Sequence, residues 1–328
     1  MKRFSSLKNS IFSLTATTAL TISLCGFLAG PLATAGEKEA PQAKRYAIIH
    51  SDDAGMSHSV NLATIEGMEK GIVSSCSIMV PCPWFPEFAK YAKEHPEKDY
   101  GIHLTLNSEF DNYRWGPVAP RDKVPSLVDP DGYLWGDKEQ VQKHARPAEV
   151  EIELRAQIDK ALNAGIRLSH LDTHMGTVIS TGEMLEIYVR LGLEYKLPVM
   201  MIRNIPPYIA VEYPDLFQKH QEYSKELESQ GLPVLDALYQ FYSGKKHEER
   251  EALYLKTLKE SGPGVTQIII HCGYDDRELQ GITSSHFIRG NDTRIFTDPK
   301  VAEQIREMGV EIVSWTQLRE MQNKQSEK

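Results

Sequence analysis

Cysteine is scarce in this sequence, with four residues among 328. Cys25 lies in an apolar N-terminal stretch, which leaves Cys76, Cys82 and Cys272 for the rest of the chain. On one extended strand Cys76 and Cys82 would lie about 20 Å apart, too far for a disulfide, although a turn at Pro81 would shorten that distance. We therefore expect three buried thiols, with neither a disulfide framework nor a zinc cluster built on cysteine.

Long apolar runs are absent after the first 35 residues, so no later segment is suited to span a membrane. The one long run extends from about Ile11 to Leu28 and is followed by the small residues Ala33-Thr34-Ala35. The basic residues before it are Lys2, Arg3 and Lys8. This pattern is typical of a secretory signal peptide, with a retained anchor as the alternative. We expect removal of residues 1–35, a short polar lead-in at 36–44, and a periplasmic or secreted protein.

Basic charge is also in short supply. Lys and Arg number 37 against 45 Asp and Glu, which gives a formal net charge of -8. Removing Lys2, Arg3 and Lys8 with the signal peptide takes away three positive charges and leaves -11. An acidic surface argues against nucleic acid or anionic lipid as a partner. The composition does not indicate an oligomeric state.

What the chain does have is an alternation of short apolar runs with amphipathic stretches of helical length. Strands are expected at 45–51, 72–80, 100–106, 166–174, 198–204, 266–273 and 310–316, and helices include 59–71, 147–165 and 298–309. Such alternation predicts right-handed βαβ units and a parallel sheet. Seven strands favour a closed or nearly closed β/α barrel. An open doubly wound sheet is the alternative, but no G-x-G-x-x-G follows the first strand.

This pattern predicts one domain over residues 45–320, with two long inserts and a tail. The inserts are expected at about 107–146 and 205–247, and residues 321–328 form a polar tail. The first insert is rich in Pro, Gly, Tyr and Trp.

Ionisable residues gather where the expected strands end. They are Asp52, Asp53, His103, His170, Asp172, His174, Arg203 and His271. In β/α barrels the C-terminal ends of the strands form the catalytic face. Each residue alone has a structural interpretation, as a helix cap, a buried core histidine or a loop residue. Several strands ending this way together favour a functional site.

One aspartate and two histidines from three strands would form a metal site with open positions for water or substrate. Such donors are expected around zinc or iron(II), whereas magnesium suits imidazole less well. A divalent ion also explains why Asp52 and Asp53 are adjacent, because it offsets the repulsion between the two carboxylates. One would be a ligand and the other a base. Strand geometry does not choose between them, since neighbouring side chains point to opposite faces.

At this point the motifs resemble those of the YdjC-like carbohydrate deacetylases, whose members include enzymes acting on chitooligosaccharides. The similarity extends from about Tyr46 to Leu318. In order, the matching segments are "SDDAG" followed by Asn61, "EKGIVSSCSIMV", "GIHLTL", "VPSLVDPDGYLW", "HLDTH" and "IIIHCG". Each fragment alone is weakly specific, but their succession in this order is strongly specific.

The resemblance implies Asp53, His103 and His174 as metal ligands, Asp52 as general base and His271 as general acid. It also implies a fold similar to that of the NodB-type polysaccharide deacetylases, a distorted β/α barrel with fewer than eight strands. Family members are generally assigned one divalent ion, commonly Mg²⁺, whereas the donor set argued above favours Zn²⁺. The expected reaction is hydrolysis of N-acetyl groups on amino sugars or oligosaccharides, with release of acetate.

Some expectations concern substrate binding. Asp172 and Arg203 are candidates for orienting the reacting groups, and Trp115 and Trp135 for stacking on sugar rings. The two tryptophans are equally suited to anchoring the first insert by packing. The sequence departs from the family pattern at His50-Ser51, Met175-Gly176 and Cys272. These departures bear on the choice of substrate more than on the type of reaction.

Two other functions stay open. One is a different metal-dependent hydrolase on the same barrel, acting on an ester or a phosphate. The chain lacks the H-x-H on the first strand expected of amidohydrolase-type barrels, and a phosphate-binding Gly loop near its last strands. The other is a non-catalytic carbohydrate-binding protein, which would need neither Asp52 as a base nor His271 as an acid.

Overall fold

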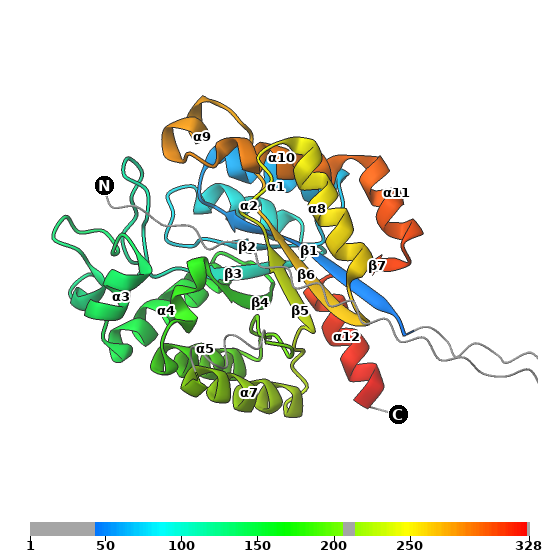
Figure 1. The fold of residues 1–328 in the computed structure, drawn as a ribbon. Helices are drawn as coiled ribbons and strands as arrows, with labels where there is room; N and C mark the ends of the chain where they lie inside the picture. Colours follow the sequence, from blue (N-terminus) through cyan, green and yellow to red (C-terminus); the bar gives the residue numbers. More distant parts are fainter. Residues whose placement is uncertain (1–42, 206–213, 327–328) are drawn as a thin grey trace, which may run out of the picture. The chain divides into compact units, whose positions relative to one another are not determined.

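The structure is a computed structural model that describes residues 43–205 and 214–326 (Figure 1). The expected signal peptide and most of the lead-in at 36–44 lie outside the described residues. From Ala43 onward the chain forms one compact unit. Within the described ranges, none of the helices has the length and apolar character needed to cross a membrane.

A parallel sheet of seven strands occupies the centre of this unit (Figure 1). The strands are β1 (Arg45–Ala54), β2 (Ser75–Ile78), β3 (Tyr100–Leu104), β4 (Leu168–Thr173), β5 (Ala237–Gln240), β6 (Gly264–Ile270) and β7 (Val310–Ile312). Their order is β4-β3-β2-β1-β6-β5, and β7 pairs with the first residues of β1. The strand ladders do not close into a ring. This arrangement confirms the expected distorted β/α barrel of about seven strands.

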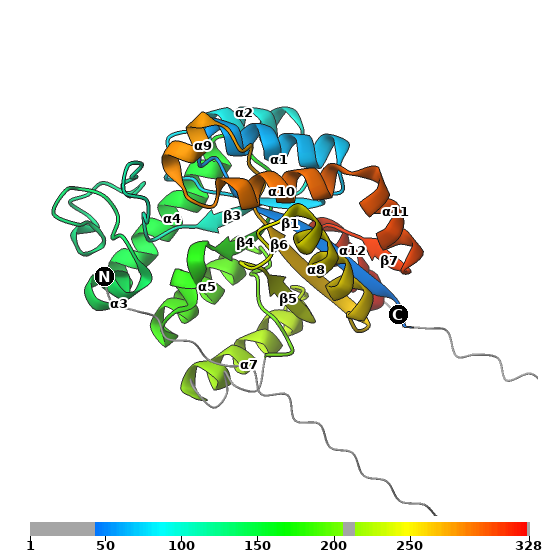
Figure 2. The same ribbon diagram turned by 45° about the horizontal axis from the view of Figure 1, so that its top comes forward.

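Helices surround the sheet in both views (Figures 1 and 2). The α-helices are α1 (His58–Lys70), α2 (Phe85–Glu94), α3 (Lys138–His144), α4 (Pro147–Asn163), α5 (Gly182–Tyr195), α7 (Pro214–Ser229), α8 (His247–Glu260), α9 (Arg277–Ile282), α10 (His286–Thr297), α11 (Pro299–Glu307) and α12 (Trp315–Ser326). Two 3-10 helices are η1 (Pro125–Leu127) and η2 (His174–Ile179). The helices expected at 59–71, 147–165 and 298–309 correspond to α1, α4 and α11.

One expected strand is wrong and one real strand was missed. Residues 198–204 form no strand but only isolated parallel bridges, Leu171 with Val199 and Ile202 with Leu235. The segment changes partner within four residues, so neither pairing extends into a ladder. The missed strand, β5, lies inside the expected second insert. Its side chains are only half buried, so it lacks the apolar run by which the other strands were recognised.

β1 positions the aspartate pair. Its last eight residues are buried, and the strand ends in a tight turn in which Asp53 has a positive φ of 71°. The Asp53 carbonyl accepts a hydrogen bond from Met56 N at 3.0 Å, and Gly55 N donates to Asn61 Oδ1 at 2.6 Å. Ser57 then caps α1 by accepting from Val60 N. The turn holds both carboxylates at the end of the strand.

The three cysteines expected to be buried thiols are free and buried. They are Cys76, Cys82 and Cys272. Burial raises the pKa of each thiol.

Candidate active site

Five of the ionisable residues predicted from strand ends line one cavity. It has a volume of about 410 Å³, and the five are Asp52, Asp53, His103, His174 and His271. Asp52 and Asp53 come from the end of β1, His103 from β3, and the two other histidines follow directly after β4 and β6. Parallel strands bring these ends to one edge of the sheet.

Asp53, His103 and His174 converge on one point of the cavity. Asp53 Oδ1 lies 3.4 Å from His103 Nε2 and 3.4 Å from His174 Nδ1. All three side chains are buried, and one potential ligand atom from each lies within 4.8 Å of the others. Asp53 Oδ1 is buried and has no hydrogen-bond partner within the described part of the chain. A buried carboxylate oxygen facing two ring nitrogens suits a bound cation.

The opposite nitrogen of each histidine meets another carboxylate. His103 Nδ1 lies 2.5 Å from Asp172 Oδ1, and His174 Nε2 lies 3.0 and 3.1 Å from the oxygens of Glu109. When each of these nitrogens donates its hydrogen to the carboxylate, the nitrogen facing Asp53 carries a free lone pair. Metal-binding histidines commonly have this second partner, which fixes the tautomer and the ring orientation.

Two other groups of His and Asp side chains are close enough to hold an ion, but they share a carboxylate whose two oxygens already contact histidines. One group is His50, His170 and Asp172, and the other is Asp52, His103 and Asp172. Both depend on Asp172, whose oxygens contact His103 Nδ1 and His50 Nε2. The group around Asp53 therefore offers the better cation site.

The electrostatic environment of this group is negative. Burial alone lowers the pKa of His174, but Glu109 and Asp53 outweigh it and raise the pKa to about 10. The pKa of His103 is also raised, because the charges of Asp172 and Asp52 overcome the effect of burial. The same negative charge that favours protonated histidines favours a divalent cation.

Asp52 has different neighbours from Asp53. Its Oδ1 lies 3.2 Å from His50 Nε2 and accepts a hydrogen bond from Ser77 Oγ at 3.4 Å. Its Oδ2 is farther from the histidines, 3.7 Å from His103 Nε2 and 4.0 Å from His271 Nε2. His50 Nε2 also lies 3.0 Å from Asp172 Oδ2, so it links the two carboxylates. Burial lowers the pKa of His50, but contacts with Asp172 and Asp52 raise it to about 9.

Arg289, from α10, also lines the site cavity. Its Nη2 donates to Asp53 Oδ2 at 2.6 Å, while Nε and Nη1 are buried without a hydrogen-bond partner among the described residues. Burial raises the pKa of Asp53, but the positive charge of Arg289, together with His174 and His271, outweighs it and holds that pKa well below its usual range. Burial and the same guanidinium lower the pKa of His271. An imidazolium with a lowered pKa is a stronger proton donor.

Four other candidates lie away from the cavity lining. Asp172 is fully buried beneath His103, and Arg203 is exposed and pairs with Glu228 and Asp236. Trp115 is buried and donates from Nε1 to the carbonyl of Asn107 at 3.0 Å. Trp135 donates to the carbonyl of Ser126 at 2.8 Å and stacks on His144. In these positions both tryptophans anchor the first insert.

Sequence reasoning missed Glu109 and Arg289. Glu109 lies in the first insert, two residues after Asn107, and Arg289 is on a helix 236 residues from Asp53. Neither is at a strand end, which was the signal used. His50 was noted only as a departure from the family pattern, although its contact with two site carboxylates places it directly beneath the site.

Comparison with known proteins gives the family. Residues 46–307 match the family described as YdjC-like protein. The chain belongs to this family. The resemblance inferred from the motifs is therefore confirmed over most of the domain.

Individual relatives of this YdjC-like chain align over nearly their whole length. The carbohydrate deacetylase of Thermoanaerobacter pseudethanolicus is 28% identical over 276 residues, covering 84% of this chain and 100% of the relative. The carbohydrate deacetylase of Enterococcus faecalis is 29% identical over 272 residues, covering 83% and 97%. A crystal structure of an E. faecalis protein assigned to cellobiose-phosphate cleavage superposes with a TM-score of 0.68 at 28% identity, covering 84% and 99%.

Proposed function

We propose that this protein is a carbohydrate deacetylase that removes N-acetyl groups from amino sugars or chitooligosaccharide-like oligosaccharides and requires a divalent metal ion. The observation that carries the proposal is the unpartnered Asp53 Oδ1, at 3.4 Å from a nitrogen of both His103 and His174. The curated relatives named carbohydrate deacetylase support the choice of reaction and substrate class.

Asp53, His103 and His174 would hold the ion. The two imidazoles support Zn²⁺ over Mg²⁺. When bound, the ion would supply a Lewis acid that polarises the amide carbonyl and acidifies water.

The chain's own residues then divide the proton transfers. Asp52 Oδ2 faces the cavity and accepts the proton of the attacking water, while His50 and Ser77 hold Oδ1. As the carbon–nitrogen bond breaks, His271 donates a proton to the departing amine, and acetate and a free amino sugar result. The His271 backbone N–H donates to Asp292 Oδ2 at 3.1 Å, which fixes the histidine at the end of β6. Arg289 orients Asp53.

The test is acetate release from N-acetylated chitooligosaccharides by protein stripped of metal and then reloaded. Activity should be lost on stripping and return with Zn²⁺. Ester and phosphate substrates assayed in parallel distinguish the alternative hydrolase. Binding of the oligosaccharide without acetate release under every metal condition would instead indicate a non-catalytic carbohydrate-binding protein.

A further inference from the structure

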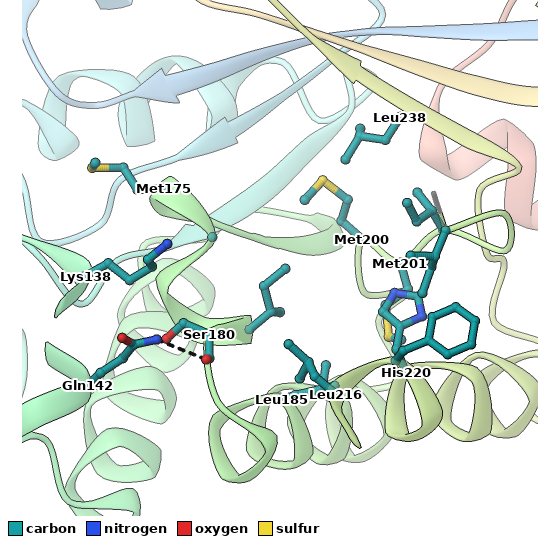
Figure 3. Close-up of a pocket in the computed structure, with 15 residues that line it drawn as sticks. Lys138, Gln142, Met175, Ser180, Leu185, Met200, Met201, Leu216, His220 and Leu238 are labelled. Carbon is teal, nitrogen blue, oxygen red and sulfur yellow. Dashed lines mark hydrogen bonds between the residues drawn. The ribbon is translucent and has the colours of Figure 1, made fainter. Parts of the chain in front are cut away.

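A second cavity adjoins the one that contains the proposed metal ligands. It has a volume of about 480 Å³, and we call it the apolar chamber (Figure 3). Its lining is mostly aliphatic or thioether side chains, including Leu185, Met201 and Leu216. Polar groups come mainly from Lys138, Gln142, Ser180 and His220, and Gln142 Nε2 donates to the Ser180 carbonyl at 3.1 Å.

The apolar chamber and the site cavity have a common wall. Both are lined by Met175, Gly176, Ile179, Met200 and Leu238. The wall begins one residue after His174. At Gly176 an added Cβ would meet no atom within 4 Å, so no side chain packs against this point of the wall. Much of the remaining wall is methionine, whose flexible side chain adapts to different occupants.

We propose that the apolar chamber receives the acyl chain of the substrate, and that the enzyme removes N-acyl groups longer than acetyl from amino sugars. This inference rests on the proposed deacetylase function and extends its substrate class. It follows from where the scissile bond must lie. The amide carbonyl has to reach Asp53, His103 and His174, and the acyl chain begins at that carbonyl carbon.

The distribution of polar and apolar side chains supports the acyl chain as the occupant of the chamber, rather than an apolar group elsewhere on the sugar. Away from the common wall, the site cavity offers polar side chains suited to sugar hydroxyls, among them Gln240, Thr283 and Ser285. The common wall instead continues from the residue after His174 into aliphatic surface. An aglycone is attached to a different ring carbon from the amide nitrogen. The acyl chain therefore has the shorter route along the common wall into the apolar chamber.

The experiment measures kcat/KM for the metal-loaded full chain on chitobiose carrying N-acetyl, N-butyryl, N-hexanoyl or N-octanoyl groups. Free amine is the product in every case. Burial of each added methylene should raise kcat/KM by about fourfold until the chamber is filled. Cleavage of the acetyl substrate with kcat/KM flat or falling along the series would overturn the inference while leaving the deacetylase function intact. Absence of cleavage throughout the series would contradict both.

Two variants on α7 test whether the dependence of kcat/KM on acyl length arises in the apolar chamber. Leu216→Trp fills the chamber and should lower the ratio of octanoyl to acetyl kcat/KM at least tenfold. Gln218→Trp adds the same bulk at an exposed position of the same helix and should leave the ratio unchanged. Equal loss on all substrates by Leu216→Trp would contradict the inference. So would a rate gain with octyl glycosides of N-acetylchitobiose but not with longer acyl groups, because it would assign the chamber to an aglycone.

Discussion

At the scale of single residues, Asp52 and Asp53 are neighbours in the sequence but have different surroundings. Asp53 Oδ1 faces two histidines without another partner, whereas Asp52 Oδ1 is held by His50 and Ser77. The strained φ of Asp53 turns its side chain away from the alternation of the strand. This geometry supports Asp53 as ligand and Asp52 as base. At the level of the sequence, that assignment of roles rested on the family resemblance alone.

The first prediction separates these two roles. Asp52→Asn should keep the metal, and its kcat should fall by about 10²–10⁴-fold, the usual contribution of a general base. Asp53→Asn should lose metal affinity, and excess metal should restore part of its activity. Metal content and turnover are measured on both variants. A metal-free Asp52→Asn beside a metal-loaded, inactive Asp53→Asn would reverse the assignment.

The second prediction concerns the carboxylates behind the ligands. Asp172→Asn and Glu109→Gln should each lower metal affinity by about 10–100-fold, because the histidine that each one orients loses its charged acceptor. Competition with a chelator measures the affinity, and circular dichroism checks that folding is unchanged. Glu97→Gln is the control, since the exposed Glu97 pairs with His95 at 3.4 Å outside the site. Equal affinities in all three variants would refute the proposed orientation.

The sequence indicated five cavity residues because each one ends, or directly follows, a recognisable strand. It could not indicate Glu109 or Arg289, which come from a long insert and from a helix whose polar residues look like ordinary surface charge. Only the folded chain brings Arg289 to Asp53. The roles of Trp115 and Trp135 were also ambiguous, because an aromatic ring in a loop suits packing and sugar binding equally.

At the scale of elements, α4 ties the first insert to the barrel through Glu153. This carboxyl is fully buried, and it accepts hydrogen bonds from the backbone nitrogens of Val118 and Ala119 at 2.9 and 2.8 Å. Gln157 donates to it at 2.8 Å and also bonds to Thr105, the residue after β3. Burial raises the pKa of Glu153 from 4.5 to about 7, and these hydrogen bonds offset only part of that increase.

The third prediction follows from this raised pKa. Between pH 4.5 and about 7 the folded protein holds a proton on Glu153 that the unfolded chain has released. The protonated Glu153 carboxyl contributes fully to the free energy of unfolding below pH 4.5. As the pH rises through about 7, this contribution is lost, and the free energy of unfolding falls by on the order of 3 kcal/mol. The free energy of unfolding of Glu153→Gln should lack this dependence on pH. Urea unfolding at pH 5 and pH 8 tests it, and parallel pH profiles for the two proteins would contradict it.

Elements with strong local signals were predictable, and those fixed by tertiary contacts were not. The helix at 147–163 begins at Pro147, and Gly165 lies two residues after its end, so its limits were clear from the sequence. Residues 198–204 have the apolar composition of a strand, but their partners on the two sides are staggered. β5 is short and half exposed, and only its pairing with β6 identifies it.

At the scale of the whole molecule, the parallel sheet brings the proposed site residues together at one edge. The order of the strands places β1 and β3 on either side of β2, with β6 on the other side of β1. Residues far apart in the chain therefore meet in a single cavity. The alternation of strands and helices in the sequence was sufficient to predict this architecture, although not the exact strand set.

The fourth prediction concerns export, because the leading residues of the chain have the pattern of a signal peptide. N-terminal sequencing of protein recovered from the periplasm or medium should begin near Gly36, after Ala33-Thr34-Ala35. Replacing Ala33 and Ala35 with bulky residues should block cleavage. Intact Met1 on protein confined to the cytoplasm would contradict export.

The pairing of β1 also has a consequence for hydrogen exchange. β1 pairs with β6 along one edge, and with β7 and then β2 along the other. Its amides should therefore exchange with deuterium only when the whole domain unfolds. The amides of β5, at the end of the strand order, should exchange through smaller local openings. The edge that carries the aspartates would thus stay rigid, while the wall containing Leu238 opens and closes on a faster timescale.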